Sequence, residues 1–133
     1  MEYKSLDHAK HNESICDHLS EQTQFNDWVI TTAFYSAIHY VSHKLFPMTI
    51  SKVTASITYE SFDEYCNGEN KFRRKHKEMR ILVERNLPSD IAAAYNQLLD
   101  SSWTARYSQY KYSNKISKLA RKRLTAVRNY CTK

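Results

Sequence analysis

One stretch in the first half of the chain is apolar on nearly every side when it is drawn as a helix. It covers residues 25–46, where Asn26 or Asp27 can cap the start and Pro47 stops the pattern. A helix that is apolar all round needs neighbours on several sides. The pattern therefore predicts the central helix of a bundle.

Four further segments repeat apolar residues at helical spacing. They are residues 5–21, 71–86, 88–110 and 114–131. A chain of 133 residues suits one domain. Its single Gly argues against most β-rich folds and excludes Walker A and Gly-x-Gly-x-x-Gly phosphate loops. We therefore predict one all-α domain over residues 1–133, built as an up-and-down helical bundle of four to five helices.

The helical period is lost between residues 47 and 70. This stretch is rich in Ser, Thr and β-branched residues, and Asn67-Gly68 is typical of a turn. We predict a long irregular connection here, with a short helix near residues 59–66. Connections of this length are usually functional or mobile.

Several polar residues fall on the faces that these helices turn inward. Tyr35 and His39 are four residues apart, as are Ser102 and Arg106, so each pair shares one helix face. If these faces meet near His76, two histidines and an arginine converge, which suffices for transesterification of RNA. The candidate catalytic residues are therefore His39, His76 and Arg106, and the candidate pocket residues are Tyr35, Tyr95, Ser102 and Tyr107. The alternative is a buried hydrogen-bond network that fixes the helix register.

Two motifs around these residues resemble those of a known family. The central helix reads Phe34-Tyr35-Ser36-Ala37-Ile38-His39. A later helix carries Tyr95 and Leu98, followed by Ser102-Trp103-Thr104-Ala105-Arg106-Tyr107. Together they resemble the HEPN superfamily, the helical domain named for higher eukaryotes and prokaryotes nucleotide-binding. The resemblance covers about residues 5–112.

This resemblance implies a four- or five-helix bundle that usually dimerises. Many members are metal-independent RNases or toxin partners in prokaryotic defence, built on an Arg followed four to six residues later by a His. No Arg precedes a His at that spacing here, since Arg73 to His76 is too short. We therefore expect a module that binds RNA or nucleotide, without the usual nuclease motif, in a defence or toxin–antitoxin-type system with a possible partner protein encoded nearby. The alternatives are a non-catalytic interaction or dimerisation module and a metal-independent RNase with a non-standard His/Arg site.

Charge is divided unevenly along the chain. Residues 1–70 hold 4 Lys and Arg against 10 Asp and Glu, a net of −6, whereas residues 71–133 hold 16 against 4, a net of +12. Such polarity indicates an anionic partner such as RNA, or an oligomer whose acidic and basic faces meet. The candidate nucleic-acid-binding residues are Lys71, Arg73, Arg74, Lys75, Lys77, Lys118, Arg121 and Lys122. The interleaved aromatic residues, which offer stacking surfaces for bases, are Trp103, Tyr107, Tyr110, Tyr112 and Tyr130.

No pattern predicts a metal site or a cofactor. His39 and His43 have the spacing of a zinc pair, but the glutamate of His-Glu-x-x-His and an evident third ligand are missing. The three cysteines are far apart, and we expect Cys16 and Cys131 to be core residues. The sequence has neither an apolar run of about 18 residues nor the start of a signal peptide, so we expect a cytoplasmic protein without membrane contact.

Overall fold

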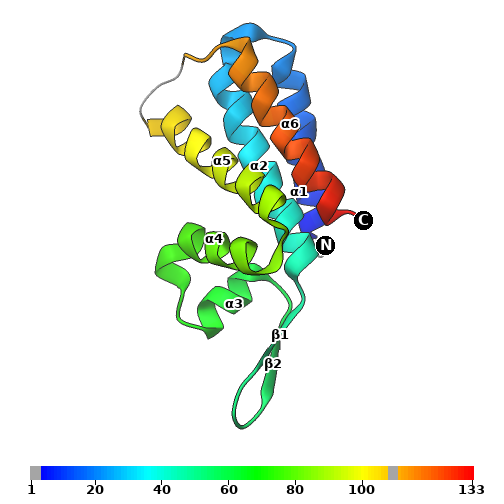
Figure 1. Ribbon diagram of the computed structural model, residues 1–133, viewed down its shortest axis with the longest axis vertical. Coiled ribbons are helices and arrows are strands. Elements are labelled where there is room, and N and C mark those ends of the chain that lie inside the picture. Colours follow the sequence, from blue (N-terminus) through cyan, green and yellow to red (C-terminus); the bar gives the residue numbers. More distant parts are fainter. Residues whose placement is uncertain (1–3, 108–110) are drawn as a thin grey trace.

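The computed structural model describes residues 4–107 and 111–133 of the chain, and four long helices dominate them. These are α1 (Ser5–Ser20), α2 (Asn26–Leu45), α5 (Ser89–Tyr107) and α6 (Asn114–Cys131), with a short 3-10 turn, η1 (Thr23–Phe25), before α2. They run alternately up and down in one bundle (Figure 1). The predicted all-α helical bundle is confirmed, and the last helix has the predicted bounds.

Long-range hydrogen bonds fix the order of helices around α2. The Ser36 hydroxyl donates to the Ala9 carbonyl at 2.7 Å, which locks α1 against α2. At the other side, the Asn26 side chain donates to the Tyr112 carbonyl at 2.8 Å and to the Asn114 side chain at 3.0 Å. The starts of α2 and α6 therefore lie together, and these two helices run in the same direction (Figure 1).

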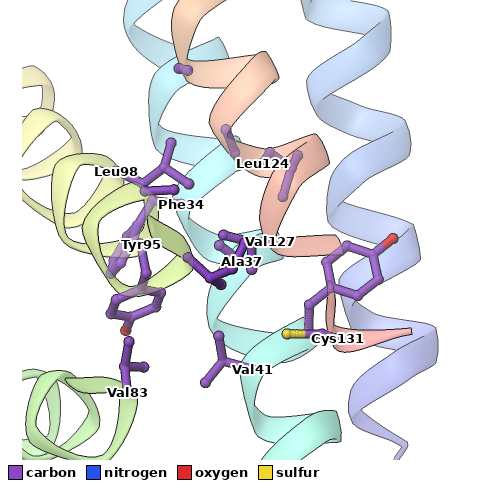
Figure 2. Close-up of a cluster of buried hydrophobic side chains, with 14 of the residues drawn as sticks. Phe34, Ala37, Val41, Val83, Tyr95, Leu98, Leu124, Val127 and Cys131 are labelled. Carbon is purple, nitrogen blue, oxygen red and sulfur yellow. The ribbon is translucent and has the colours of Figure 1, made fainter. Parts of the chain in front are cut away.

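The core explains why the central helix is apolar on nearly every side. Val29, Ile30, Phe34 and Val41 of α2 are fully buried because α1, α5 and α6 each cover one of its faces. Figure 2 shows Leu98 of α5 beside Phe34, and the α6 residues Leu124 and Val127 on another side of α2. Cys16 and Cys131 are buried in this core, as expected, and burial raises the pKa of each thiol to about 11.

The segment between α2 and α5 is ordered, which corrects the prediction of an irregular connection over residues 47–70. It forms an antiparallel hairpin of β1 (Met48–Ser51) and β2 (Ser56–Tyr59), with Met48 opposite Tyr59. A short helix α3 (Phe62–Gly68) follows, a few residues later than predicted, and then a 3-10 turn η2 (Phe72–Arg74) and helix α4 (Lys75–Asn86). We call residues 46–88 the insertion, because the bundle closes on either side of them (Figure 1).

The insertion has a small core of its own. Tyr59, Tyr65, Cys66 and Leu82 are buried together, and Phe46 and Phe62 pack against them. The Ser61 hydroxyl caps α3 by accepting from the Glu64 amide at 3.1 Å. The hairpin itself projects away from the bundle (Figure 1). Among the described residues, no helix is long and apolar enough to cross a membrane.

Candidate functional site

A pocket lies where the insertion meets the bundle. Its volume is about 250 Å³, and we call it the central pocket. Helix α2 contributes Ile38, His39 and Ser42 to its wall, and α5 contributes Tyr95. The remaining wall comes from Ser5 and from the insertion, through Ser61, Phe62, Asp63, Lys75, His76 and Met79. The pocket thus exists only because α3 and α4 fold back onto α2.

His39 is held at the α1 side of this pocket by a stacked partner. The rings of His39 and His8 lie 3.7 Å apart, centroid to centroid, with 20° between their planes. Burial and the neighbouring His8 lower the pKa of His39 to about 4, and the Asp63 carboxylate opposes that shift only in part. His39 is therefore neutral at pH 7, with one ring nitrogen able to accept a proton or a hydrogen bond.

His76 links the central pocket to a second, shallower hollow. That hollow is lined by His76, Trp103, Arg106 and Tyr107, and we call it the outer recess. The His76 ring lies 5.8 Å from the Phe34 ring, and partial burial followed by the nearby Arg106 charge lowers the pKa of His76. His76 is thus also neutral at pH 7 and faces both hollows.

Arg106 is positioned on the α2 side of the outer recess by a tyrosine. Its guanidinium donates to the Tyr35 hydroxyl at 2.7 Å and to the Ser102 carbonyl at 3.2 Å. The guanidinium carbon also lies 5.1 Å from the Tyr107 ring centroid, within cation–π range. The predicted meeting of Tyr35 and Arg106 is therefore present, with the charge presented next to two aromatic rings.

Ser102 and Tyr95, the other candidate pocket residues on α5, differ in their hydrogen bonding. Ser102 is fully buried, and its hydroxyl donates to the Leu99 carbonyl of its own helix at 2.9 Å, so it belongs to the hydrogen-bond network rather than to either hollow. Tyr95 is also fully buried, lines the central pocket, and has a hydroxyl without a hydrogen-bond partner among the described residues. Burial raises the pKa of Tyr95, which keeps the hydroxyl protonated.

The basic residues before and in α4 gather around a further hollow. Lys71, Arg73 and Arg74 line it with Phe72, whose ring lies 5.7 Å from the Arg73 guanidinium carbon. Two charges are paired locally, since Lys71 lies 3.5 Å from Glu78 and Lys75 lies 3.0 Å from Asp63. Arg73, Arg74 and Lys77 are exposed. We call Arg73, Arg74 and Lys77 the α4 basic cluster, and His76, which lines the outer recess, lies within the same stretch of sequence.

The basic residues of α6 face another part of the molecule. Arg121 pairs with Asp17 of α1 at 3.0 Å, and Arg128 pairs with Glu13, which also accepts from the Tyr40 hydroxyl. Lys118 and Lys122 line the same groove as these acidic residues. The predicted nucleic-acid set is therefore split in two, and in its α6 part Arg121 is paired with a carboxylate of α1. Of the interleaved aromatic residues, Tyr110 lies outside the described residues.

Sequence reasoning missed the wall that the insertion supplies. Phe62 and Asp63 line the central pocket although no motif singled them out. The only available signal was the capping pattern of Ser61 ahead of Glu64. Among residues 4–107 and 111–133, no group of three His, Cys, Asp or Glu side chains could hold a metal ion.

The two hollows differ in the groups that they offer to a ligand. The central pocket is lined by two neutral histidines and by the hydroxyl-bearing residues Ser5, Ser42, Ser61 and Tyr95. The outer recess offers the Arg106 cation beside the flat apolar surfaces of Trp103 and Tyr107. No family model matches the sequence, and the searches of curated proteins and of solved structures also returned no match.

Proposed function

We propose that this chain is an RNA- or nucleotide-binding module resembling HEPN domains, working in a prokaryotic defence or toxin–antitoxin-type system. It acts in the cytoplasm as a homodimer, with a partner protein encoded nearby. The observation that carries the binding function is the outer recess, where Trp103 and Tyr107 line a hollow with Arg106 and His76. Trp103 is 55% exposed and Tyr107 68% exposed, which is unusual for such large rings.

Single-stranded RNA needs both kinds of group that meet at this recess. Exposed rings stack on bases, and cations track the phosphates between them. The Trp103 and Tyr107 ring centroids lie 5.5 Å apart, so the two rings form one continuous apolar surface next to the Arg106 charge. The exposed Arg73, Arg74 and Lys77 add positive charge on both sides of His76 in the sequence, at the end of η2 and in the first turn of α4.

The internal pairing of α1 with α6 favours this proposal over a dimer held by opposite charges. Asp17 and Glu13 already contact Arg121 and Arg128 within one chain. Two carboxylates of the acidic half therefore already have cationic partners on α6 within one chain. The exposed α4 basic cluster is therefore the better candidate for contact with a polyanion.

A nuclease remains the second candidate, because His39 and His76 line one pocket. Acid–base cleavage of RNA needs a proton donor as well as a base. The lowered pKa of both histidines favours their neutral forms at pH 7, so neither ring supplies the protonated imidazolium of a two-histidine mechanism. Binding without cleavage is therefore the function that the geometry supports best.

The test is retention of labelled single-stranded RNA in EDTA over a salt series, with shift and cleavage read on the same gels. The wild-type chain is expected to retain RNA without cutting it. Trp103→Ala should weaken retention about tenfold, because stacking contributes about 1–3 kcal/mol per base. The control is Tyr130→Ala on α6, which removes a ring that does not line the outer recess and should leave retention unchanged.

Charge variants separate the two basic regions. Arg73→Ala/Arg74→Ala/Lys77→Ala should make the log–log salt slope shallower by about 2, at about 0.7 per phosphate contact. Lys118→Ala/Lys122→Ala should leave the slope as it is, because Glu13 and Asp17 share that groove. No retention at low salt would overturn the proposal and make the outer recess a protein-docking surface. Cleavage that disappears in both His39→Ala and His76→Ala would instead establish the nuclease.

A further inference from the structure

The central pocket has the size of a small ligand and is separate from the exposed recess. Its volume is about 250 Å³, and Ile38, Phe62 and Met79 make much of its wall apolar. An engineered apolar cavity of about 150 Å³ is large enough for benzene. The central pocket is therefore large enough for two fused rings.

Tyr95 adds a polar group, its hydroxyl, to the largely apolar wall of this pocket. It is buried and has no hydrogen-bond partner among the described residues, a state that native proteins rarely keep without a reason. Figure 2 shows the hydroxyl directed toward α4, beside Val83, and α4 forms the pocket wall through His76 and Met79. A ligand with a ring nitrogen or an N–H group would supply the missing partner.

The charges around the pocket cancel. Lys75 is paired with Asp63 at 3.0 Å, and both line the pocket. His39 and His76 are neutral at pH 7, because burial and a neighbouring positive or titratable group lower the pKa of each. A phosphate or carboxylate would enter without an unpaired cation to meet it, whereas an uncharged ring system would lose little by leaving water.

We infer that the central pocket binds one uncharged, planar, two-ring nitrogen heteroaromatic, of which a purine base is the simplest example. Its ring system packs against Ile38, Phe62 and Met79, and a ring nitrogen pairs with the Tyr95 hydroxyl. Two sources share this chemistry. One is a free small molecule, and the other is a single base of RNA lying on the outer recess and passing His76, which lines both hollows. The second source rests on the proposed function.

The first experiment titrates the full chain with free adenine and with benzimidazole in a calorimeter, with inorganic phosphate as the anionic comparison. Adenine and benzimidazole are expected to bind, and phosphate is not. Tyr95→Phe keeps the ring and removes only the hydroxyl, so it should weaken binding about 5- to 15-fold. Its melting temperature should stay equal or rise, because a buried hydroxyl without a partner has been removed.

A second variant tests the space itself. Ile38→Trp places a large ring in the pocket and should abolish binding while the helical circular dichroism spectrum is kept. Ser42→Ala, on the same helix and also lining the pocket, changes little volume and serves as the matched control. Wild-type affinity in both Tyr95→Phe and Ile38→Trp would overturn the inference.

The RNA arm distinguishes the two sources. For a base of RNA, an oligonucleotide with one purine among pyrimidines should bind more tightly than the same strand with an abasic site, and Ile38→Trp should erase that difference. If the natural ligand is a free small molecule, adenine should bind to the wild-type chain, and Ile38→Trp should leave RNA retention unchanged. If neither adenine, benzimidazole nor a purine in RNA responds, the inference is wrong. If the wild-type chain binds adenine but does not retain RNA, the proposed function is wrong and the inference about the central pocket stands.

Discussion

The bundle and the insertion are stabilised in different ways. The bundle buries apolar side chains of α1, α5 and α6 around α2 in one continuous core. The insertion adds Met79, Val83 and Leu87 to that core. Its own cluster has only four buried residues, which are Tyr59, Tyr65, Cys66 and Leu82, and the rest of it depends on polar contacts. One such contact is the Glu69 carboxylate, which pairs with Lys52 at 2.8 Å and accepts from the Tyr59 hydroxyl at 2.6 Å.

This difference indicates a division of labour at the central pocket, in which the bundle provides its rigid wall and the insertion its more mobile wall. The bundle supplies Ile38, His39 and Tyr95 from long, well-packed helices, and the insertion supplies the facing wall from short elements. Segments with few buried contacts open locally at a lower free energy than the core. The insertion is therefore the side of the pocket that can move to admit a ligand, while the bundle keeps its own residues in place.

The largest effect is expected from deleting the same side chain in each core. Leu124 is 2% exposed in the bundle and Leu82 is 5% exposed in the insertion. Leu124→Ala should lower the free energy of unfolding in urea by about 3–5 kcal/mol, because the surrounding helices cannot close the cavity. Leu82→Ala should cost about half as much globally and should raise hydrogen exchange mainly in residues 46–88. Equal costs with exchange spread over α1 and α6 would contradict the division of labour.

A smaller effect is expected at the only glycine of the chain. A Cβ built on Gly68 would lie 2.5 Å from the Tyr59 ring, closer than real contacts allow. Gly68→Ala should therefore displace Tyr59, break its hydrogen bond to Glu69, and cost about 1–3 kcal/mol of stability within the insertion. Hydrogen exchange of β1, β2 and α3 is the measurement.

The control for this prediction is a double variant. If the methyl group acts through the ring, adding Gly68→Ala to Tyr59→Ala should cost almost nothing further, giving a clear coupling energy. Additive costs would show that the alanine acts elsewhere in α3.

Sequence patterns predicted the bundle well for a physical reason. Helical period is a local property, so α6 could be placed at residues 114–131 and α2 recognised as central from its apolar circumference. The hairpin was missed because its turn, closed by the Lys52 amide and the Ala55 carbonyl at 2.8 Å, contains none of the Gly or Asn residues that mark turns. Its Ser- and Thr-rich strands are mostly exposed and give no alternation of the usual kind.

The candidate site was predictable only in part. The shared helix faces of Tyr35 with His39 and of Ser102 with Arg106 are also local, and they bring most of the predicted set to two adjoining hollows. Whether a hydroxyl lines a pocket or bonds to its own helix depends on its rotamer and its neighbours. The Ser102 hydroxyl donates to its own helix, whereas the Tyr95 hydroxyl does not. The pairing of Arg121 with Asp17 spans 104 residues, a separation that no charge count along the chain reveals.

A pH effect should appear at the boundary between the two regions. The His39 pKa is lowered to about 4 from an ordinary 6.5, so the unfolded chain takes up a proton there before the folded chain does. Stability should be complete above pH 6.5 and fall as the pH drops toward 4, by an amount on the order of 2 kcal/mol after solvent screening. Urea unfolding at a series of pH values measures it.

His39→Gln is the variant that isolates this term, because a glutamine keeps polar contacts and does not titrate. The fall in stability between pH 6.5 and 4.5 should become shallower, with His76 accounting for what remains. The Glu69 carboxylate, whose pKa is held below its usual value by hydrogen bonds from Lys52 and Tyr59, adds its own loss only below about pH 4.5. An unchanged profile in His39→Gln would mean that His39 is not the group that senses acid.

The smallest effect is expected from the exposed ion pairs, one in each region. Asp17–Arg121 joins α1 to α6 in the bundle, and Asp63–Lys75 joins α3 to α4 in the insertion, each at 3.0 Å and with side chains more than 40% exposed. Double-mutant cycles with Asp17→Asn/Arg121→Gln and Asp63→Asn/Lys75→Gln should each give a coupling of about 0.2–1 kcal/mol that shrinks in salt. Water screens both pairs alike, so we expect neither ion pair to be a main source of stability in its region. A coupling above about 2 kcal/mol for Asp17–Arg121 alone would break the comparison, because the bundle would then depend on the pairing of its acidic and basic helices as well as on its apolar core.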